Sequence, residues 1–162
     1  MPPPLAPVVR PAVGEDLGAL QELARRTIRA RYRSFLGDES VDRFISSGAS
    51  DDHIASHFRQ GHVHCMEAGG DTVGLMILDG PTIDLMLIDV DRQRQGLGRV
   101  LLSQAEEMLF AEYENIRLES FADNHVANAF YEACGWSTAG PLEAEGPAKI
   151  EFVQRRGAAP AD

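Results

Sequence analysis

Hydrophobic residues in the second half of the chain switch between the two-residue spacing of strands and the longer spacing of helices. Apolar positions at 82–88 and alternating ones at 116–121 predict two strands. A helix that begins near Arg99 is predicted after the first of them. Its apolar face consists of Leu101, Leu102, Ala105, Met108 and Leu109. A second, shorter helix is predicted after the second strand.

The rest of the chain divides into shorter predicted elements. These are a strand at 8–10, a helix at 16–35, helical pieces at 41–45 and 51–58, and strands at 62–68, 72–78 and 148–154. Gly69-Gly70-Asp71 separates two of these strands and has the composition of a hairpin turn. We expect residues 1–6 to be a loose end, 7–154 a single domain and 155–162 a flexible tail.

Two segments between these elements are typical of a ligand site. The loop 93–98 follows an apolar strand and opens a helix, and it carries Gly96 and Gly98. Backbone N–H groups at a helix start point outward without partners, and glycine lets an anion approach them, so the loop is either a phosphate site or an ordinary turn. Basic residues surround it at Arg92, Arg94 and Arg99. They favour an anionic ligand.

The second segment, 124–136, predicts a short capped helix after the strand at 116–121. Asp123 or Asn124 can cap its start, and Gly135 fits the position just past its end. One face of the helix carries Ala127, Phe130, Tyr131 and Cys134.

Together the two segments resemble the GNAT superfamily of acyl-coenzyme A dependent N-acetyltransferases. The family's pyrophosphate loop pattern is matched by Gln93, Gly96 and Gly98, and its second pattern by Asn124, Ala127, Tyr131, Gly135 and Trp136. Val90 and Arg92 depart from the family, which usually has a proline and an aromatic residue there. The resemblance implies an α/β (α+β) fold. Its central sheet is mixed, mostly antiparallel and six- to seven-stranded, is flanked by helices, and has a V-shaped splay between 82–88 and 116–121.

The resemblance also implies a cosubstrate and a reaction. Acetyl-coenzyme A would lie along Met86, Leu87 and Ile88, with its pyrophosphate on the amides of Gln93, Arg94, Gln95, Gly96, Leu97, Gly98 and Arg99, and its pantetheine arm near Asn124. An amine would attack the thioester directly, without an acyl-enzyme. Tyr131 is the candidate general acid, because its phenol stays protonated at neutral pH. The alternative role of Tyr131 is packing beside Phe130.

The general base has several candidates. Asp84 is expected on the same face of its strand as Met86 and Ile88, from the two-residue period, so it is a candidate catalytic residue. Other candidates are Asp79, Glu119, His62 and His64, or a chain of water molecules.

Charge indicates the kind of acceptor. The net charge is −10, yet residues 1–60 carry eight acidic and eight basic side chains. Residues 61–90 contain no Lys or Arg; their acids are Glu67, Asp71, Asp79, Asp84 and Asp89. These either form an acidic cleft that favours a cationic amine, on a small molecule or peptide, or are solvated surface residues. The five arginines of the first helix, at 25, 26, 29, 31 and 33, are expected on a solvated face.

Composition limits the remaining possibilities. With 162 residues, 44% of them hydrophobic and 25% charged, the chain suits one globular domain. No long apolar run or signal-peptide pattern is present, so we expect a cytoplasmic protein without membrane contact. Cys65 and Cys134 are expected to be buried thiols. His53 and His57 have metal-ligand spacing without a third ligand nearby in sequence, so no metal is expected.

Two other functions stay open. The first is a non-catalytic acyl-coenzyme A binding module that regulates a partner. The second is a toxin that acetylates charged tRNA, which the acidic charge opposes, so no nucleic-acid partner is expected. The sequence does not distinguish a monomer from a homodimer.

Overall fold

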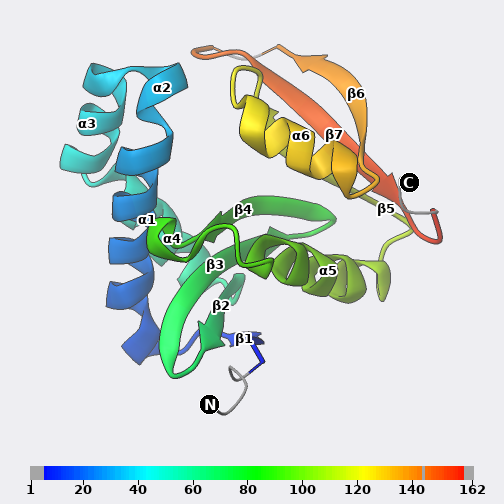
Figure 1. Cartoon of the computed structure of the whole chain (residues 1–162), viewed down its shortest axis with the longest axis horizontal. Coiled ribbons are helices and arrows are strands. Elements are labelled where there is room, and N and C mark those ends of the chain that lie inside the picture. The colour runs from blue at the N-terminus through cyan, green and yellow to red at the C-terminus, as the bar shows by residue number, and fades with distance from the viewer. Residues whose placement is uncertain (1–5, 144, 159–162) are drawn as a thin grey trace.

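The chain forms a seven-stranded sheet with helices on both faces (Figure 1). The computed structural model describes residues 6–143 and 145–158. Its strands are β1 (Val8–Pro11), β2 (Val63–Ala68), β3 (Asp71–Asp79), β4 (Thr82–Ile88), β5 (Asn115–Phe121), β6 (Ser137–Leu142) and β7 (Lys149–Arg155). Its helices are α1 (Leu17–Arg31), α2 (Arg33–Leu36), α3 (Asp38–Ser46), α4 (Ala49–Arg59), α5 (Leu97–Phe110) and α6 (His125–Ala133), with 3₁₀ turns η1 (Gly14–Asp16) and η2 (Val90–Arg92).

The strands are ordered β1-β2-β3-β4-β5-β7-β6 across the sheet. Every neighbouring pair is antiparallel except β4–β5, which is parallel. The mixed, mostly antiparallel seven-stranded sheet predicted for the chain is therefore confirmed. The parallel pair brings the carboxyl ends of β4 and β5 to the same edge, and each end leads toward a helix, α5 or α6.

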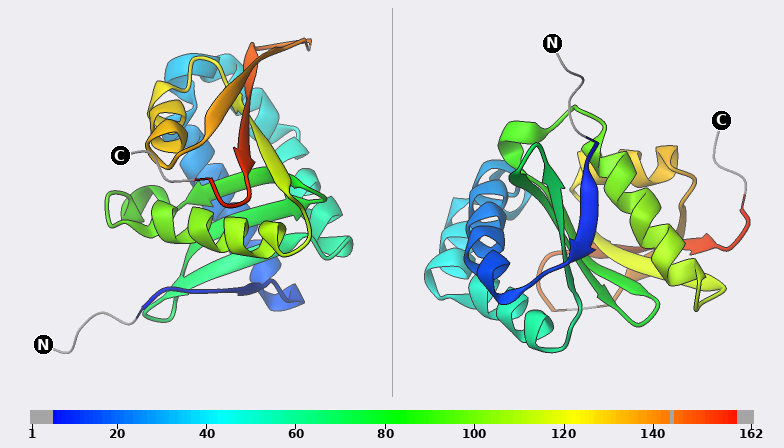
Figure 2. Two further views of the ribbon diagram at one scale, coloured as in Figure 1. Left: turned by 90° about the vertical axis from the view of Figure 1, so that its right-hand side faces the viewer. Right: turned by 90° about the horizontal axis from the view of Figure 1, so that it is seen from below.

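Helices cover both faces of the sheet (Figure 2), and each face has its own hydrophobic core. On one face α5 and α6 pack against buried residues that include Leu101, Leu118 and Phe152. On the other face α1, α3 and α4 cover β2, β3 and β4, with Leu20 and Ile54 fully buried between them. The β4–β5 junction is therefore flanked by different helices on its two faces.

Most predicted elements are present, with two differences. The helix predicted at 16–35 is interrupted at Tyr32, which separates α1 from α2. At the break the Tyr32 ring packs against Phe35 and against Phe121 at the end of β5, with ring centroids 5.1 and 6.0 Å away. The helical pieces expected at 41–45 and 51–58 are the centres of the longer α3 and α4.

The second difference is β6, which is not among the predicted elements. β6 contains Gly140 and Pro141, which rarely occur inside strands. They are tolerated because β6 is the edge strand and its pairing with β7 is irregular between Thr138 and Gly140. The predicted hairpin turn is confirmed, because Gly69 and Gly70 connect β2 to β3 and both have positive φ, 60° and 87°, as this kind of two-residue turn requires.

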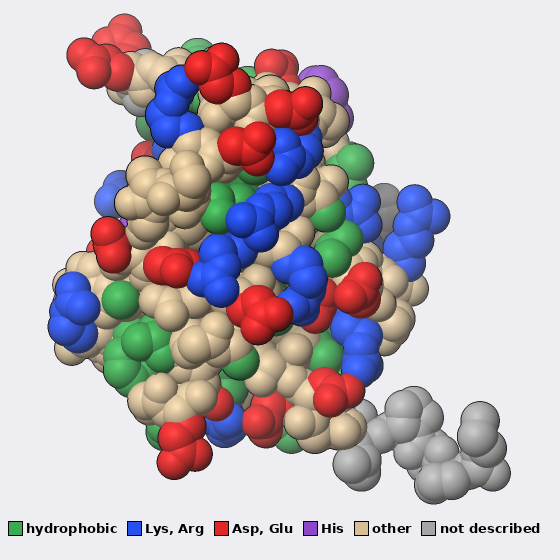
Figure 3. Space-filling view, turned by 90° about the vertical axis from the view of Figure 1, so that its left-hand side faces the viewer, with side chains coloured by type: hydrophobic (Ala, Val, Ile, Leu, Met, Phe, Trp, Pro, Cys, Tyr) green, Lys and Arg blue, Asp and Glu red, His purple; other side chains and the backbone are tan. Residues whose placement is uncertain are grey.

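The arginines of α1 are less solvated than expected. Figure 3 shows this side of the molecule, where basic and acidic side chains alternate. Arg25 pairs with Asp51 at 2.6 Å, Arg26 with Asp89 at 2.5 Å, and the neighbouring Arg33 with Asp42 at 2.7 Å. Arg29 and Arg31 form no salt bridge within the described ranges. Residues 1–5 and 159–162, which carry most of the expected loose ends, lie outside the described residues.

Candidate functional site

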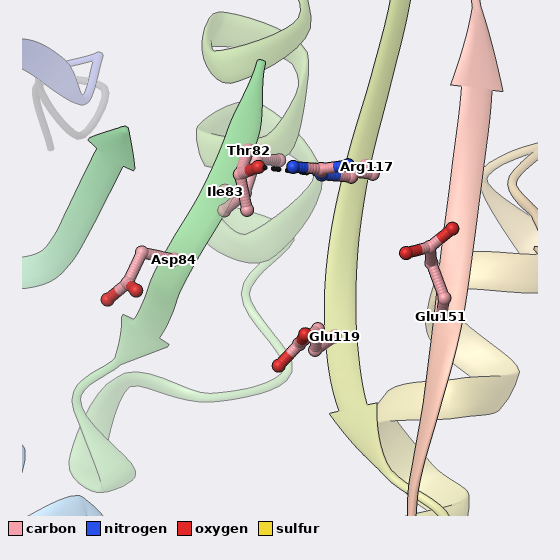
Figure 4. Close-up of a pocket in the computed structure, with 6 residues that line it drawn as sticks. All are labelled: Thr82, Ile83, Asp84, Arg117, Glu119 and Glu151. Carbon is pink, nitrogen blue, oxygen red and sulfur yellow. Dashed lines mark hydrogen bonds between the residues drawn. The ribbon is translucent and has the colours of Figure 1, made fainter. Parts of the chain in front are cut away.

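The parallel strands β4 and β5 separate soon after they begin. Register pairs join Thr82 to Arg117 and Ile83 to Leu118, and no further pair joins the two strands within the described residues. From Asp84 onward the strands diverge, which confirms the predicted V-shaped splay (Figure 4). The edge of β4 that faces β5 therefore offers backbone groups for a ligand rather than for a neighbouring strand.

The glycine loop lies at the open end of this splay. Two of its residues have positive φ, Arg94 at 64° and Gly96 at 77°. Gln93 donates from Nε2 to the carbonyl of Ile88 at 3.1 Å, which ties the loop to the end of β4. The amide of Val100 donates back to Gly96 at 3.3 Å, while those of 97–99 have no acceptor among the described residues. Together with the positive end of α5, these amides can bind an anion.

Ion pairs hold the segment that leads into the glycine loop, and two further arginines lie in or next to the loop. Asp89, only 7% exposed, accepts from the amide of Asp91 at 3.1 Å and from Arg26 of α1. Arg26 therefore helps to position the loop, a role that the sequence does not indicate. Arg92 is paired with Asp71. Arg94 and Arg99 form no salt bridge in the described part of the chain.

The other predicted cofactor residues are divided between the two faces. Met86 and Ile88 pack on the α5 side, whereas Leu87 is buried on the α1 side. The side chain of Leu97, the first residue of α5, is buried, so only its backbone can contact a ligand, and Gln95 is exposed. A Cβ at Gly98 would lie 3.5 Å from the Phe130 ring, which shows how closely α5 approaches α6.

Helix α6 is held against the end of β5 by its asparagines. The side chain of Asn124 caps the helix by accepting from the amide of Ala127 at 3.4 Å. Asn128 is buried, accepts from Ser120 at 2.6 Å, and donates to the carbonyls of Phe121 and Ala122 at 3.2 Å. Sequence analysis did not single out Asn128, because its role depends on contacts with the preceding strand. These bonds fix the helix that carries Tyr131.

Tyr131 lies in an aromatic environment on the α6 side of the sheet. Its ring centroid is 5.5 Å from those of Phe130 and Phe152. Burial raises the pKa of the Tyr131 phenol above its usual value, and the phenol of Tyr32 adds to this rise. Its hydroxyl has no hydrogen-bond partner among the described residues, so it is a protonated donor available to a ligand. Tyr32, whose own pKa burial raises to about 12, was predicted only as an apolar helix position.

A β-bulge changes the expected orientation of Asp84. Ile77 pairs with Leu85 but Leu78 pairs with Ile83, so Asp84 is an extra residue in β4. The bulge resets the two-residue alternation of side chains. Asp84 therefore points to the α4 side, where it meets His53, and not to the side of Met86 and Ile88. The prediction that the three share one face is wrong.

Asp84 lines a pocket of about 340 Å³ where the strands begin to part. The other lining residues are Thr82, Ile83, Arg117, Glu119 and Glu151, from β4, β5 and β7 (Figure 4). The lining thus contains three carboxylates and one arginine, whose Nε donates to the Thr82 hydroxyl at 3.1 Å. Glu119 is partly neutralised by Lys149 at 3.7 Å. The pocket has the electrostatics of a site for a cation.

Only one acidic residue of the 61–90 segment lines this pocket. Glu67 pairs with Arg10 at 2.8 Å, Asp71 with Arg92, and Asp89 with Arg26. Asp79 lies 4.0 Å from His62. Of the two alternatives for these five carboxylates, a shared acidic cleft is therefore wrong, because most of them pair elsewhere. The acidic pocket instead combines Asp84 with Glu119 and Glu151, which sequence proximity could not reveal.

Asp84 is paired with histidine. Its Oδ2 lies 2.6 Å from His53 Nε2. Burial alone would raise the pKa of Asp84, but the hydrogen bond from His53 and the nearby histidine charges outweigh burial and lower it. The same hydrogen bond raises the pKa of His53. Among the rival bases, Glu119 lines the pocket, whereas His62, His64 and Asp79 are not among its lining residues.

The structure also corrects the expectation that His53 and His57 lack a third ligand. His53, His57 and Asp84 each place a donor atom within 4.8 Å of the other two, and His57, His62 and Asp79 do the same. Asp84 lies 31 positions from His53 in sequence, so no spacing rule could find the first group. Cys65 is buried, Cys134 is partly exposed, and neither forms a disulfide.

Comparisons with known proteins agree with this architecture. The sequence model of the acetyltransferase (GNAT) domain matches residues 33–152. A GCN5-related N-acetyltransferase structure from Rhodopseudomonas palustris is 18% identical, with a TM-score of 0.82 over 93% of this chain and 96% of that one. A PaiA N-acetyltransferase from Thermoplasma acidophilum, solved in complex with coenzyme A, is 17% identical, with a TM-score of 0.78 over 93% and 99%.

A third solved structure, the ribosomal-protein-S18-alanine N-acetyltransferase from Escherichia coli, is 21% identical, with a TM-score of 0.68 over 95% and 96% of the two chains. No curated protein matches the chain in a sequence search. The likeness to solved structures establishes the GNAT fold. Because the domain model covers most of the chain, the chain belongs to the GNAT acetyltransferase family. No helix within the described residues is long and apolar enough to cross a membrane.

Proposed function

We propose that this protein transfers the acetyl group of acetyl-coenzyme A to a cationic primary amine of a small molecule or peptide. The observation that carries the proposal is the β4–β5 splay, which has a glycine loop at its open end and an acidic pocket where the strands part. Cosubstrate and acceptor can thus approach the same gap in the sheet from different sides.

The cosubstrate fits the groups at the open end. The pyrophosphate would accept hydrogen bonds from the free amides at the start of α5, with Arg94 and Arg99 nearby. The pantetheine arm would bond to the unpaired edge of β4 near Met86. Because the Ile88 carbonyl already accepts from Gln93, it has one lone pair left for the ligand. Asn124 uses its side-chain oxygen as a helix cap, which leaves its amide nitrogen for the arm.

Binding in this groove makes the transfer effectively intramolecular, because the thioester is held beside the acceptor. The neutral amine attacks the acetyl carbonyl carbon, and the carbonyl oxygen becomes an oxyanion that a β4 amide can stabilise. The carbon–sulfur bond then breaks, Tyr131 donates a proton to the sulfur, and the proton that the nitrogen loses as the amide forms restores the phenol. No covalent bond to the enzyme is formed, and the raised pKa of Tyr131 means that its phenol is protonated at neutral pH when the sulfur begins to leave.

The amine must lose a proton before it attacks. An alkylammonium ion is attracted to the pocket by Asp84, Glu119 and Glu151. Asp84 is the candidate base, and its hydrogen bond to His53 leads from the pocket to a side chain that is 45% exposed.

A turnover screen tests this function. Thiol release from acetyl-coenzyme A would be measured with polyamines, aminoglycosides, amino acids and peptide N-termini, and the product confirmed by mass spectrometry. We expect a cationic amine to be the best acceptor, with kcat/KM rising with pH as the amine deprotonates and falling as salt increases. Tight coenzyme A binding without turnover of any amine would instead indicate the non-catalytic binding module. A neutral or anionic best acceptor would contradict the role of the pocket.

A further inference from the structure

Two histidines of α4 meet the carboxylate of Asp84 beside the acidic pocket. His53 and His57 are one helical turn apart, and their rings lie 4.7 Å from each other. His53 Nε2 is 2.6 Å from Asp84 Oδ2, and His57 Nε2 is 3.8 Å from the same oxygen. Nothing in the acetyl-transfer proposal requires His57 at this position.

The side chains of His62 and Asp79 support the orientation of His57. Its Nδ1 lies 2.9 Å from Nδ1 of His62, whose Nε2 faces Asp79 Oδ1 at 4.0 Å. A proton on His62 Nε2, the nitrogen that faces Asp79, would make His62 Nδ1 the acceptor and His57 Nδ1–H the donor. The lone pair of His57 Nε2 then points toward the Asp84 carboxylate. Two electron-rich atoms face each other there, as they do on either side of a bound cation.

We propose that His53, His57 and Asp84 form a binding site for a divalent transition-metal ion of the zinc class. Imidazole and carboxylate together suit such ions, whereas Mg²⁺ and Ca²⁺ prefer oxygen ligands alone. Donor atoms around a tetrahedral zinc ion lie about 3.3 Å apart, given bonds of about 2.0–2.1 Å. Two of the three separations in the cluster, 2.6 and 3.8 Å, lie on either side of that value, and the two histidine nitrogens lie within 4.8 Å of each other, so small side-chain rotations would complete the site.

The site leaves space for water ligands on the ion and has a side chain that can hydrogen-bond to one of the histidine ligands. His53 is 45% exposed, so an ion and its water ligands have access from solvent. A metal-bound His57 would donate its other ring N–H to His62, a hydrogen bond of the kind that usually orients a metal-binding histidine. Because Asp84 also lines the pocket, an ion held there withdraws the carboxylate from an incoming amine. This consequence rests on the proposed function, whereas the binding site itself does not.

The direct test is titration of untagged, chelator-treated full-length protein with Co²⁺, followed by competition with Zn²⁺. We expect one equivalent of Co²⁺ to produce visible absorption bands of a low-coordinate site, which Zn²⁺ then abolishes. His53→Ala, His57→Ala and Asp84→Asn should each weaken binding by about 100-fold or more, because each removes one of three ligands. His62→Ala should weaken it by about 10-fold, as expected for an outer partner. His125→Ala, on the exposed start of α6, is the matched control and should bind normally.

Two results would overturn the assignment. The first is wild-type-like Co²⁺ affinity in folded His53→Ala or Asp84→Asn protein, with folding checked by circular dichroism. The second is loss of binding in Asp79→Asn but not in Asp84→Asn, which would place the ion between His57, His62 and Asp79. Because absorbance reports binding without acetyl transfer, the metal site can fail while the acetyltransferase proposal stands, and the reverse.

Discussion

The charge of the proposed acceptor pocket can be changed in both directions. Glu151→Gln removes a carboxylate and keeps the length of the side chain, whereas Arg117→Gln replaces the guanidinium by a shorter, neutral polar group. If the acceptor is a cation, the first substitution should lower kcat/KM and the second should raise it. Opposite effects are the distinctive outcome, because general damage to the pocket would lower the rate in both variants.

Coulomb's law gives the size of the effect. Two unit charges about 6 Å apart interact by about 0.7 kcal/mol in water and about 2.8 kcal/mol at an effective dielectric constant of about 20. The pocket is open to solvent and the side chain of Glu119 is 53% exposed, so the smaller value is the better guide. About 1 kcal/mol per charge corresponds to about a fivefold change in kcat/KM. Glu119→Gln should change it less than Glu151→Gln, because Lys149 already partly neutralises Glu119.

Steady-state kinetics at low and at physiological salt would measure these effects with the best amine from the screen. Screening over about 8 Å at 0.15 M salt should reduce both effects by about half. Changes of the same sign in Glu151→Gln and Arg117→Gln, or changes that do not depend on salt, would refute electrostatic attraction of the acceptor.

Three further predictions concern the glycine loop, helix α6 and pH. Gly96→Val should weaken coenzyme A binding about tenfold or more in calorimetry, because a β-branched residue is strained at a φ of 77°. Gly98→Ala, at an ordinary helical position, is the control and should fold normally. Unchanged affinity in folded Gly96→Val would argue against the loop as the pyrophosphate site. Asn128→Ala should lower the free energy of unfolding by about 2–4 kcal/mol, because Ser120 and the carbonyls of Phe121 and Ala122 lose their hydrogen-bond partner. A loss below about 1 kcal/mol in urea unfolding would contradict the role of Asn128 in holding α6 against β5. Burial lowers the pKa of His64, so as pH falls the unfolded chain binds a proton at His64 before the folded chain does. The stability that the neutral ring contributes is therefore lost as pH falls below about 6.5. His64→Leu should reduce this pH dependence, and an unchanged pH profile of unfolding in the variant would count against the prediction.

Much of the fold could be predicted because its signals are local. The hairpin depends on Gly69 and Gly70, the loop on Gly96, and the α6 helix on its cap at Asn124 and its end at Gly135. Each of these positions has a backbone requirement that only a few residue types meet. The family motifs then placed β4 and β5 side by side, which periodicity alone cannot do.

The acceptor side could not be predicted, because it depends on contacts between distant residues. The bulge at Asp84 reverses a side chain that strict alternation placed on the other face. The break at Tyr32 follows from packing against Phe121 on β5, far along the chain. His53 reaches Asp84 only after α4 packs on the sheet. Sequence patterns report local geometry, and none of these contacts is local.

The measurement that tests the central claim most directly compares Tyr131→Phe with the unmodified protein. The substitution removes the hydroxyl that we assign to protonation of the sulfur and retains the ring that packs against Phe130 and Phe152. Single-turnover kinetics with saturating acetyl-coenzyme A should show a loss in rate of about 100-fold or more, while calorimetry shows nearly unchanged coenzyme A affinity. Equal rates in the two proteins would contradict the account and leave Tyr131 as a packing residue of α6.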